Sequence, residues 1–131
     1  MGILAGKRPN NLGVASRKLA PCPSSPNCVS SQAEGKHYIK PLAFNSDPKI
    51  AWAKLRKILL SSEEVKLIEA SDTYLYAECS TPIMGFVDDP EFYLSSEERV
   101  FHVRSASRLG YSDMGKNRKR VEQIRRKLKG V

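Results

Sequence analysis

The chain has 131 residues, of which 40% are hydrophobic and 27% are charged, and its net charge is +8 at pH 7. This length suits one domain, and the composition excludes a chain that is disordered throughout. The sequence has no run of about 18 apolar residues and begins without the long apolar core of a secretory signal, so we expect a soluble, cytoplasmic protein with no transmembrane segment.

The first 36 residues predict an irregular arm, because they contain prolines and glycines and show little apolar periodicity. An arm of this length has to be either docked or mobile. We expect it to be docked on a single domain that spans residues 37–131.

The arm contains two of the three cysteines, Cys22 and Cys28, and the third is Cys79. Three interpretations of Cys22 and Cys28 remain open: free thiols, a local disulfide in an oxidising compartment, or a metal-binding pair. His37 and His102 are too few to complete a convincing metal site. We therefore expect neither a metal nor a cofactor.

The rest of the chain predicts five strands and two helices. Pro41 places the first strand at a sheet edge, since it has no N–H to donate. Apolar residues at spacings of three and four predict the helices, the second of which carries Val121, Ile124 and Leu128 on one stripe. The predicted strands are 38–44, 65–70, 73–79, 86–94 and 99–106, and the first helix runs from 47 to about 61. The order β-α-β-β-β-β-α favours an α+β fold, an antiparallel sheet of about five strands with both helices on one face.

The last two strands form a predicted hairpin whose turn is the polar segment 95–98. This register places Glu91 opposite His102 and Asp89 opposite Arg104, so that the charged residues share one face. The other face is the predicted core face, with Phe86, Pro90, Phe92, Leu94, Phe101 and Val103. Asp88 is the exception on that apolar face, and Ser105 or Arg108 could supply the partner that it needs.

The paired charges have two interpretations. Glu91 and His102 could act as an acid and a base in a hydrolase or lyase, with Asp89 and Arg104 as orienting neighbours. Alternatively, the four residues could be ordinary ion pairs on a solvated sheet face.

The loop after the hairpin also has two interpretations. Ser112 and Asp113 are possible helix caps, and Arg108, Lys116 and Arg118 are nearby, which is typical of an anion site at a helix start. The alternative is a capped loop in which glycines adopt positive φ.

Together these patterns favour a non-enzymatic binding module for a small anionic or amphipathic ligand, with residues 22–31 as a lid. Its candidate ligand-binding residues are Asp88, Asp89, Glu91, His102, Arg104, Ser105, Ser107, Arg108, Ser112, Asp113, Asn117 and Arg118. A further alternative rests on the C-terminal segment 115–131, which has eight Lys or Arg and one Glu. Its basic residues, from Lys116 to Lys129, could bind nucleic acid or an acidic membrane surface by charge, or could simply form a solvated helix face.

Four motifs carry a resemblance to a known family. They are RPNNLG at 8–13, CPSSPNCVSS at 22–31, FVDDPEF at 86–92 and VRSASRLGYSDMGKNR at 103–118. With these motifs the chain resembles a bacterial and plastid-lineage family of conserved proteins catalogued as domain of unknown function 1499. The resemblance implies that the arm and the hairpin belong to one domain. It implies no reaction, and because relatives often carry export or lipoprotein signals, it leaves an exported or organellar location open.

Overall fold

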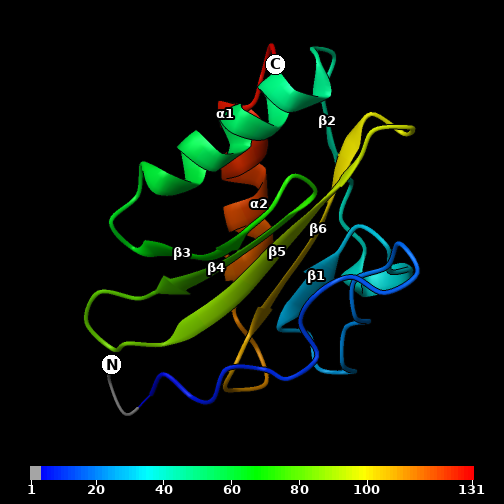
Figure 1. The fold of residues 1–131 in the computed structure, drawn as a ribbon. Coiled ribbons are helices and arrows are strands. Elements are labelled where there is room, and N and C mark those ends of the chain that lie inside the picture. Colours follow the sequence, from blue (N-terminus) through cyan, green and yellow to red (C-terminus); the bar gives the residue numbers. More distant parts are fainter. Residues whose placement is uncertain (1–3) are drawn as a thin grey trace.

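The computed structural model describes residues 4–131, so residues 1–3 of the predicted arm lie outside it. Six antiparallel strands form one sheet in the order β1-β6-β5-β4-β3, and β2 pairs with β6 beside this path (Figure 1). The strands are β1 (Cys28–Ser30), β2 (Leu42–Ala43), β3 (Val65–Ala70), β4 (Tyr74–Ser80), β5 (Val87–Ser95) and β6 (Val100–Ser107), and the helices are α1 (Pro48–Leu60) and α2 (Lys116–Lys127). The α+β fold is confirmed.

Both helices begin where local hydrogen bonds favour a start. The Asp47 carboxylate accepts a hydrogen bond from the backbone N–H of Lys49 at 2.9 Å, and Pro48 occupies the first turn of α1, where it loses no helical hydrogen bond. Before α2, Gly115 has a φ of 79°, a conformation that glycine adopts without strain, and the Asp113 side chain accepts from the N–H groups of Gly115 and Asn117.

The main core lies between the helices and one face of the sheet. Trp52 and Leu55 of α1, Val121 of α2, and Phe92 and Phe101 of the sheet belong to one buried cluster. The predicted apolar face of the hairpin therefore does face the core. Burial of these side chains supplies the main driving force for packing the helices onto the sheet.

The hairpin register differs by two residues from the predicted one. Glu91 pairs with Arg104 and Tyr93 pairs with His102, so neither predicted charge pair, Glu91–His102 or Asp89–Arg104, is formed across the strands. The turn begins one residue later than expected and ends at Arg99, whose φ of 57° places it in the left-handed region. A slip of two residues leaves every side chain on its predicted face, which is why the core face was still correct.

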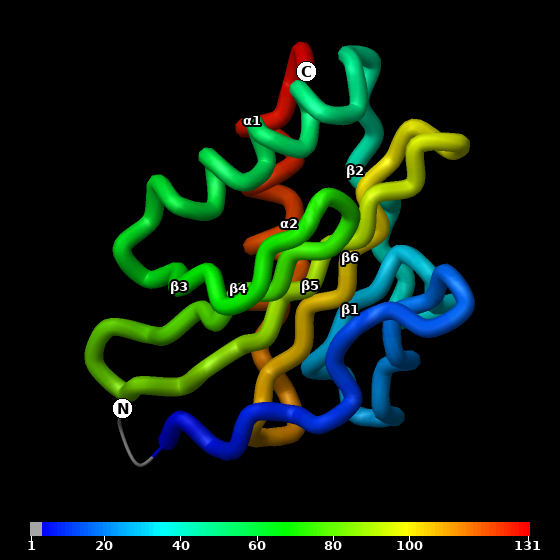
Figure 2. Tube along the Cα trace, in the orientation of Figure 1, coloured from blue at the N-terminus to red at the C-terminus, as the bar shows by residue number. Residues whose placement is uncertain are grey.

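The N-terminal part of the chain differs more from the prediction. The expected strand over 38–44 is reduced to Leu42–Ala43, and residues 35–37 form one turn of 3-10 helix before it. The arm contributes a strand that the sequence did not predict, β1, which pairs with β6 at the edge of the sheet. Figure 2 shows the arm crossing the face of the sheet opposite α2 before it enters β1.

Candidate functional site

The charged face of the hairpin is buried beneath the arm. Asp89, Glu91 and Arg104 are exposed by only 1%, 0% and 4%. Leu19 of the arm packs with Tyr74 and Tyr76 of β4 on this side of the sheet. The interpretation of these residues as ion pairs on a solvated sheet face is therefore wrong about the solvation, because it took no account of what covers the face.

One half of the buried network is centred on Arg108. Its guanidinium donates to both carboxylate oxygens of Asp89, and the shortest of these hydrogen bonds are 2.9 Å from Nε to Oδ2 and 2.8 Å from Nη2 to Oδ1. It also donates to Glu78, which receives a second hydrogen bond from Arg8 of the arm at 2.7 Å. Tyr76 donates its hydroxyl hydrogen to Asp89. Burial opposes ionisation of Glu78, but the hydrogen bonds from Arg8, Arg108 and Tyr76 outweigh it and lower its pKa to about 2.

The other half joins Glu91 and Arg104 to the arm. Glu91 Oε2 accepts from the backbone N–H of Gly13 at 2.8 Å and from the Tyr74 hydroxyl, while Arg104 Nη2 donates to the carbonyl of Pro21 at 3.3 Å. The guanidinium of Arg104 lies 3.7 Å from Glu91 Oε1. Burial raises the pKa of Glu91 and lowers that of Arg104, since a low-dielectric interior disfavours both charged forms.

The network balances its own charges. Its three carboxylates face three guanidinium groups; they are Glu78, Asp89 and Glu91 with Arg8, Arg104 and Arg108. Each charge in the network lies beside an opposite charge, although Glu91 Oε1 and Arg104 Nε have no hydrogen-bond partner. The contacts reach to the side chain of Arg8 and the backbone of the arm, so the network fastens the arm to the sheet.

His102 lies apart from Glu91. Its Nε2 is 2.7 Å from Glu98 in the hairpin turn, and its Nδ1 is 3.0 Å from the hydroxyl of Ser31 in the arm. Ser31 also accepts a hydrogen bond from the backbone N–H of Val103 at 2.9 Å. The acid and base pair that would support hydrolase or lyase chemistry is therefore not formed.

A second buried cluster lies on the helix side of the sheet, around Asn117. Its amide group donates to Ser107 at 2.9 Å and to Asp113 at 2.8 Å, and its carbonyl accepts from Ser105 at 2.6 Å. These contacts hold the start of α2 against β6. Four of the twelve predicted ligand-binding residues are thus brought together in a structural joint.

Asp88, the carboxylate on the apolar face, is paired with α2. Its Oδ2 lies 3.1 Å from Lys116 Nζ and 2.7 Å from Arg120 Nη2. Its expected partners, Ser105 and Arg108, bind elsewhere. The predicted partners of Asp88 were therefore wrong, but the expectation that this buried carboxylate has a charged partner is met by Lys116 and Arg120.

Ser112 and Arg118 do not join either cluster. The Ser112 hydroxyl accepts from the N–H of Met114 at 3.2 Å, and Arg118 donates to the carbonyl of Lys36 at 3.2 Å, both at exposed positions. Of the predicted set, only the residues on the same sheet face or under the start of α2 lie close together.

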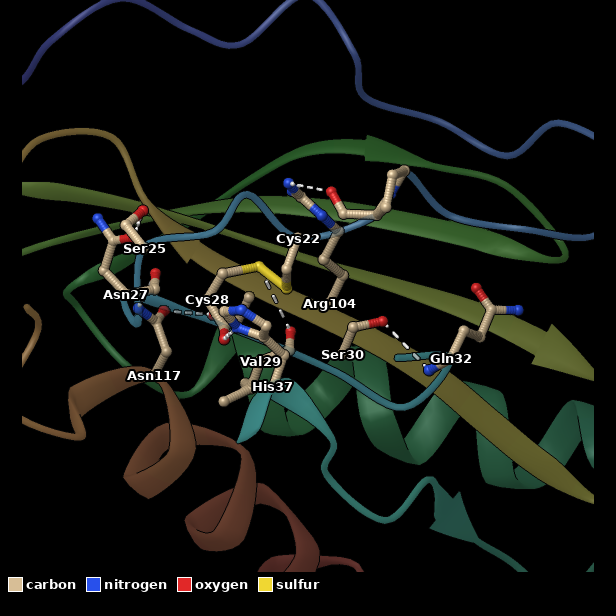
Figure 3. Close-up of a disulfide and its surroundings, with 12 residues drawn as sticks. Cys22, Ser25, Asn27, Cys28, Val29, Ser30, Gln32, His37, Arg104 and Asn117 are labelled. Carbon is tan, nitrogen blue, oxygen red and sulfur yellow. Dashed lines mark hydrogen bonds between the residues drawn. A yellow bond between two sulfur atoms is a disulfide. The ribbon is translucent and has the colours of Figure 1, made fainter. Parts of the chain in front are cut away.

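Cys22 and Cys28 form a disulfide with a Cα–Cα distance of 5.7 Å. Of the three interpretations left open by the sequence, the structure therefore contains the local disulfide. Figure 3 shows the disulfide close to Arg104 and to His37, whose Nδ1 lies 3.0 Å from the carbonyl of Cys28. Cys79 is a free, buried thiol, and burial raises its pKa to about 11. Among residues 4–131 no group of three or more His, Cys, Asp or Glu side chains is arranged to hold a metal ion.

A cavity of about 300 Å³ opens between the end of α1, the end of β4 and one face of α2; we call it the basic cleft. Its apolar lining consists of Ile58, Leu59, Val65 and Ile124. Its cations are Lys116, Lys119, Arg120 and Lys127, and Glu64 is its one acidic lining residue. Two of these cations, Lys116 and Arg120, form salt bridges with Asp88, which does not itself line the cleft.

Most cleft residues were missed by the sequence prediction, which named only Lys116 and then the C-terminal segment as a whole. The signal was present in the spacing of Lys116, Arg120, Gln123 and Lys127, which puts them on one stripe of a helix. The sequence could not reveal that this stripe faces the end of α1.

A second depression, of about 950 Å³, lies along α1 and the turns of the two hairpins. Charges of both signs surround it: Asp47, Lys49, Arg56, Lys57 and Asp72. Because charges of both signs line the depression, it favours neither an anionic nor a cationic ligand. It is therefore a weaker candidate for a binding site than the basic cleft.

The comparisons with known proteins agree with the resemblance found in the sequence. A family model described as "Protein of unknown function (DUF1499)" matches residues 18–128. No curated protein and no solved structure matches the chain. Within the described residues, no helix is long and apolar enough to cross a membrane.

Proposed function

Because the chain belongs to the DUF1499 family, which is of unknown function, its role has to be derived from its own geometry, and we propose that it binds a small amphipathic anion in the basic cleft. The observation that carries this proposal is the convergence of four cations from one face of α2 on a cavity with an apolar lining. This is a binding role; the proposal includes no catalytic step.

Three physical features support the site. The cavity volume of about 300 Å³ lies at the lower end of the range for small-molecule pockets. Lys116 and Arg120 are oriented in advance by Asp88, which lowers the entropic cost of arranging them around a ligand. Lys119 and Lys127 form no salt bridge with any residue in the range 4–131, so their charge is available to an anion.

The ligand chemistry follows from the lining. Ammonium and guanidinium groups favour a phosphate, sulfate or carboxylate head, and Ile58, Leu59 and Val65 favour a short apolar tail. Inorganic phosphate carries the head alone, whereas octyl phosphate carries both parts. We therefore expect octyl phosphate to bind more tightly than inorganic phosphate.

Titration calorimetry with octyl phosphate tests the site. Replacing both cleft cations in K119A/K127A should weaken binding at least tenfold, because two charge contacts are lost without disturbing the pairs around Asp88. The matched control is R126A/K129A, which removes the same charge from exposed positions of the C-terminal segment that do not line the cleft. Equal weakening in both variants would show that the net charge binds the anion and that the cleft does not.

We also propose that the protein works in an oxidising compartment, such as an exported or organellar location, instead of the cytoplasm first expected. The Cys22–Cys28 disulfide supports this, since cytosolic proteins rarely keep structural disulfides. The mass of the intact protein isolated from its own cells, measured after alkylation without reductant, tests it. Alkylation of Cys22 and Cys28 would contradict the proposal.

A further inference from the structure

Two loops of the protein expose large apolar side chains at their tips. The loop at 81–86, between β4 and β5, carries Ile83, which is 94% exposed, and Met84. The loop at 108–115, between β6 and α2, carries Tyr111 and Met114, which are 70% and 89% exposed, and the partly exposed Leu109. Single exposed apolar side chains are common, but a concentration of them in two neighbouring loops indicates a contact surface.

The two loops leave the same end of the sheet. Asp88, next to the first loop, pairs with Ser107, next to the second, and the backbone N–H of Arg108 donates to the carbonyl of Val87 at 3.2 Å. In Figure 1 both loops lie in the lower part of the view, opposite the turn between β5 and β6. Both loop tips therefore lie at one end of the sheet, along which the arm also runs, since Arg108 donates to the carbonyl of Gly6.

Positive charge accompanies the apolar tips. The first turn of α2 begins two residues after Met114 and contains Lys116, Arg118 and Lys119, the last two of which are exposed. The two loops contain one acidic residue, Asp113, whose carboxylate already accepts hydrogen bonds from Gly115 and Asn117. Lys116 is paired with Asp88, whereas Arg118 and Lys119 form no salt bridge within residues 4–131, so this end of the molecule offers apolar side chains beside two exposed cations.

We propose that this end of the protein docks on the surface of an anionic phospholipid bilayer. Exposed apolar side chains beside Lys and Arg are the combination that binds a bilayer interface, and tyrosine is favoured at that depth. Each Lys or Arg near an anionic surface adds to the attraction. Tips on separate loops suit a fluid acyl layer, which needs none of the shape complementarity of a protein interface.

The docking surface is separate from the ligand site, although both use the start of α2. None of the five apolar side chains lines the basic cleft. The two proposals can therefore fail independently: I83S/M114S should keep its affinity for octyl phosphate, whereas K119A/K127A should lose that affinity.

Cosedimentation with sucrose-loaded vesicles tests the docking proposal. The wild-type protein should bind vesicles of phosphatidylcholine with phosphatidylglycerol and should bind pure phosphatidylcholine at least tenfold more weakly. I83S/M114S should bind the mixed vesicles at least tenfold more weakly than the wild type, because two apolar side chains no longer enter the interface. The control I50S/L60S removes two side chains of α1 that are 64% and 59% exposed, and it should bind as the wild type does.

Three results would overturn the proposal. The first is a wild-type protein that stays in the supernatant at every lipid concentration. The second is equal vesicle binding by I83S/M114S and the wild type, which would leave only a charge effect. The third is displacement from the vesicles by a single-stranded RNA that I83S/M114S binds equally well, which would identify the cations of α2 as a nucleic-acid surface.

Discussion

At the scale of single residues, Ser31 joins the arm to the sheet through both its backbone and its hydroxyl group, a role that no sequence motif indicated. Its backbone N–H donates to the carbonyl of Val103, and its hydroxyl accepts from the N–H of the same residue. The hydroxyl also lies 3.0 Å from His102 Nδ1, which in turn is held by Glu98. One small side chain therefore satisfies a buried backbone group and orients an imidazole.

We expect S31A to lower the free energy of unfolding by about 1–3 kcal/mol, because the Val103 N–H is left buried without a partner. Chemical denaturation followed by circular dichroism measures the effect. S24A, at an exposed position of the same arm, is the control and should change stability by less than about 0.5 kcal/mol. A variant S31A as stable as S24A would show that water replaces the lost hydroxyl.

At the scale of elements, the arm behaves as part of the sheet and not as an appendage. It supplies β1 to the edge of β6, and its backbone at Gly13 and Pro21 bonds to Glu91 and Arg104. The disulfide fixes the segment that leads from Pro21 into β1. Each of these contacts restricts the arm to one path across the sheet.

We expect reduction of the disulfide to destabilise the protein by about 2 kcal/mol, the loop-entropy contribution of a short closed loop. Dithiothreitol should lower the free energy of unfolding of the wild type by this amount. It should leave C22S/C28S unchanged, since this variant has no disulfide to lose. Identical stability of the wild type with and without reductant would mean that the hydrogen bonds of the arm suffice without the covalent link.

At the scale of the whole molecule, the sheet separates two kinds of interior. On the helix side the core is apolar, and on the arm side it contains a neutral network of carboxylates and guanidinium groups. Breaking a buried ion pair by removing one partner is costly, even where the intact pair adds little stability. The protein should therefore be sensitive to protonation of these carboxylates.

The pH dependence of Glu78 has a definite sign. Its pKa is lowered from 4.5 to about 2 in the folded state, so its ionised form stabilises the protein above about pH 4.5 and this stabilisation is lost as the pH falls towards 2. Glu91 acts oppositely, because its raised pKa makes the protein lose stability as the pH rises through that value. Glu78 therefore contributes to the acid limb of the stability curve, together with Glu98, Asp113 and Glu122, whose pKa values are also lowered.

We expect E78Q to lower the free energy of unfolding at pH 6 by on the order of 2 to 3 kcal/mol and to flatten its pH dependence between about 4.5 and 2. Denaturation midpoints measured across this range give the comparison. E63Q, at an exposed position before β3, should keep the wild-type dependence. An unchanged acid limb in E78Q would assign the dependence to another carboxylate.

Much of the fold could be predicted because it follows from local periodicity. The helix expected from 47 to about 61 spans Pro48–Leu60, and the strand at 65–70 has its predicted bounds. The hairpin register could not be predicted, because the turn ends in a left-handed Arg99 and no glycine marks that position. The three-residue β1 was missed since its only strong signal is pairing with a strand almost 80 residues later.

The site was harder to predict than the fold. Alternation along the two strands grouped Asp89, Glu91, His102 and Arg104 on one face, whereas Arg108 was expected in the loop after the hairpin. The arm buries Asp89, Glu91 and Arg104, so they hold the arm on the sheet instead of facing solvent. No local sequence pattern shows what covers a sheet face. The cations of the basic cleft lie on a predicted helix, but their convergence depends on how α1 and α2 pack.

The pairing of β1 with β6 also sets an order for biosynthesis. Cys22 and Cys28 are six positions apart and can meet soon after they emerge, whereas the strand that receives β1 is made almost 80 residues later. Contacts of such sequence separation form slowly, since a long loop must close first. Until then the polar face of the sheet and the arm's carbonyls remain in water. A nascent chain that is cut short before β6 lacks the strand with which β1 pairs.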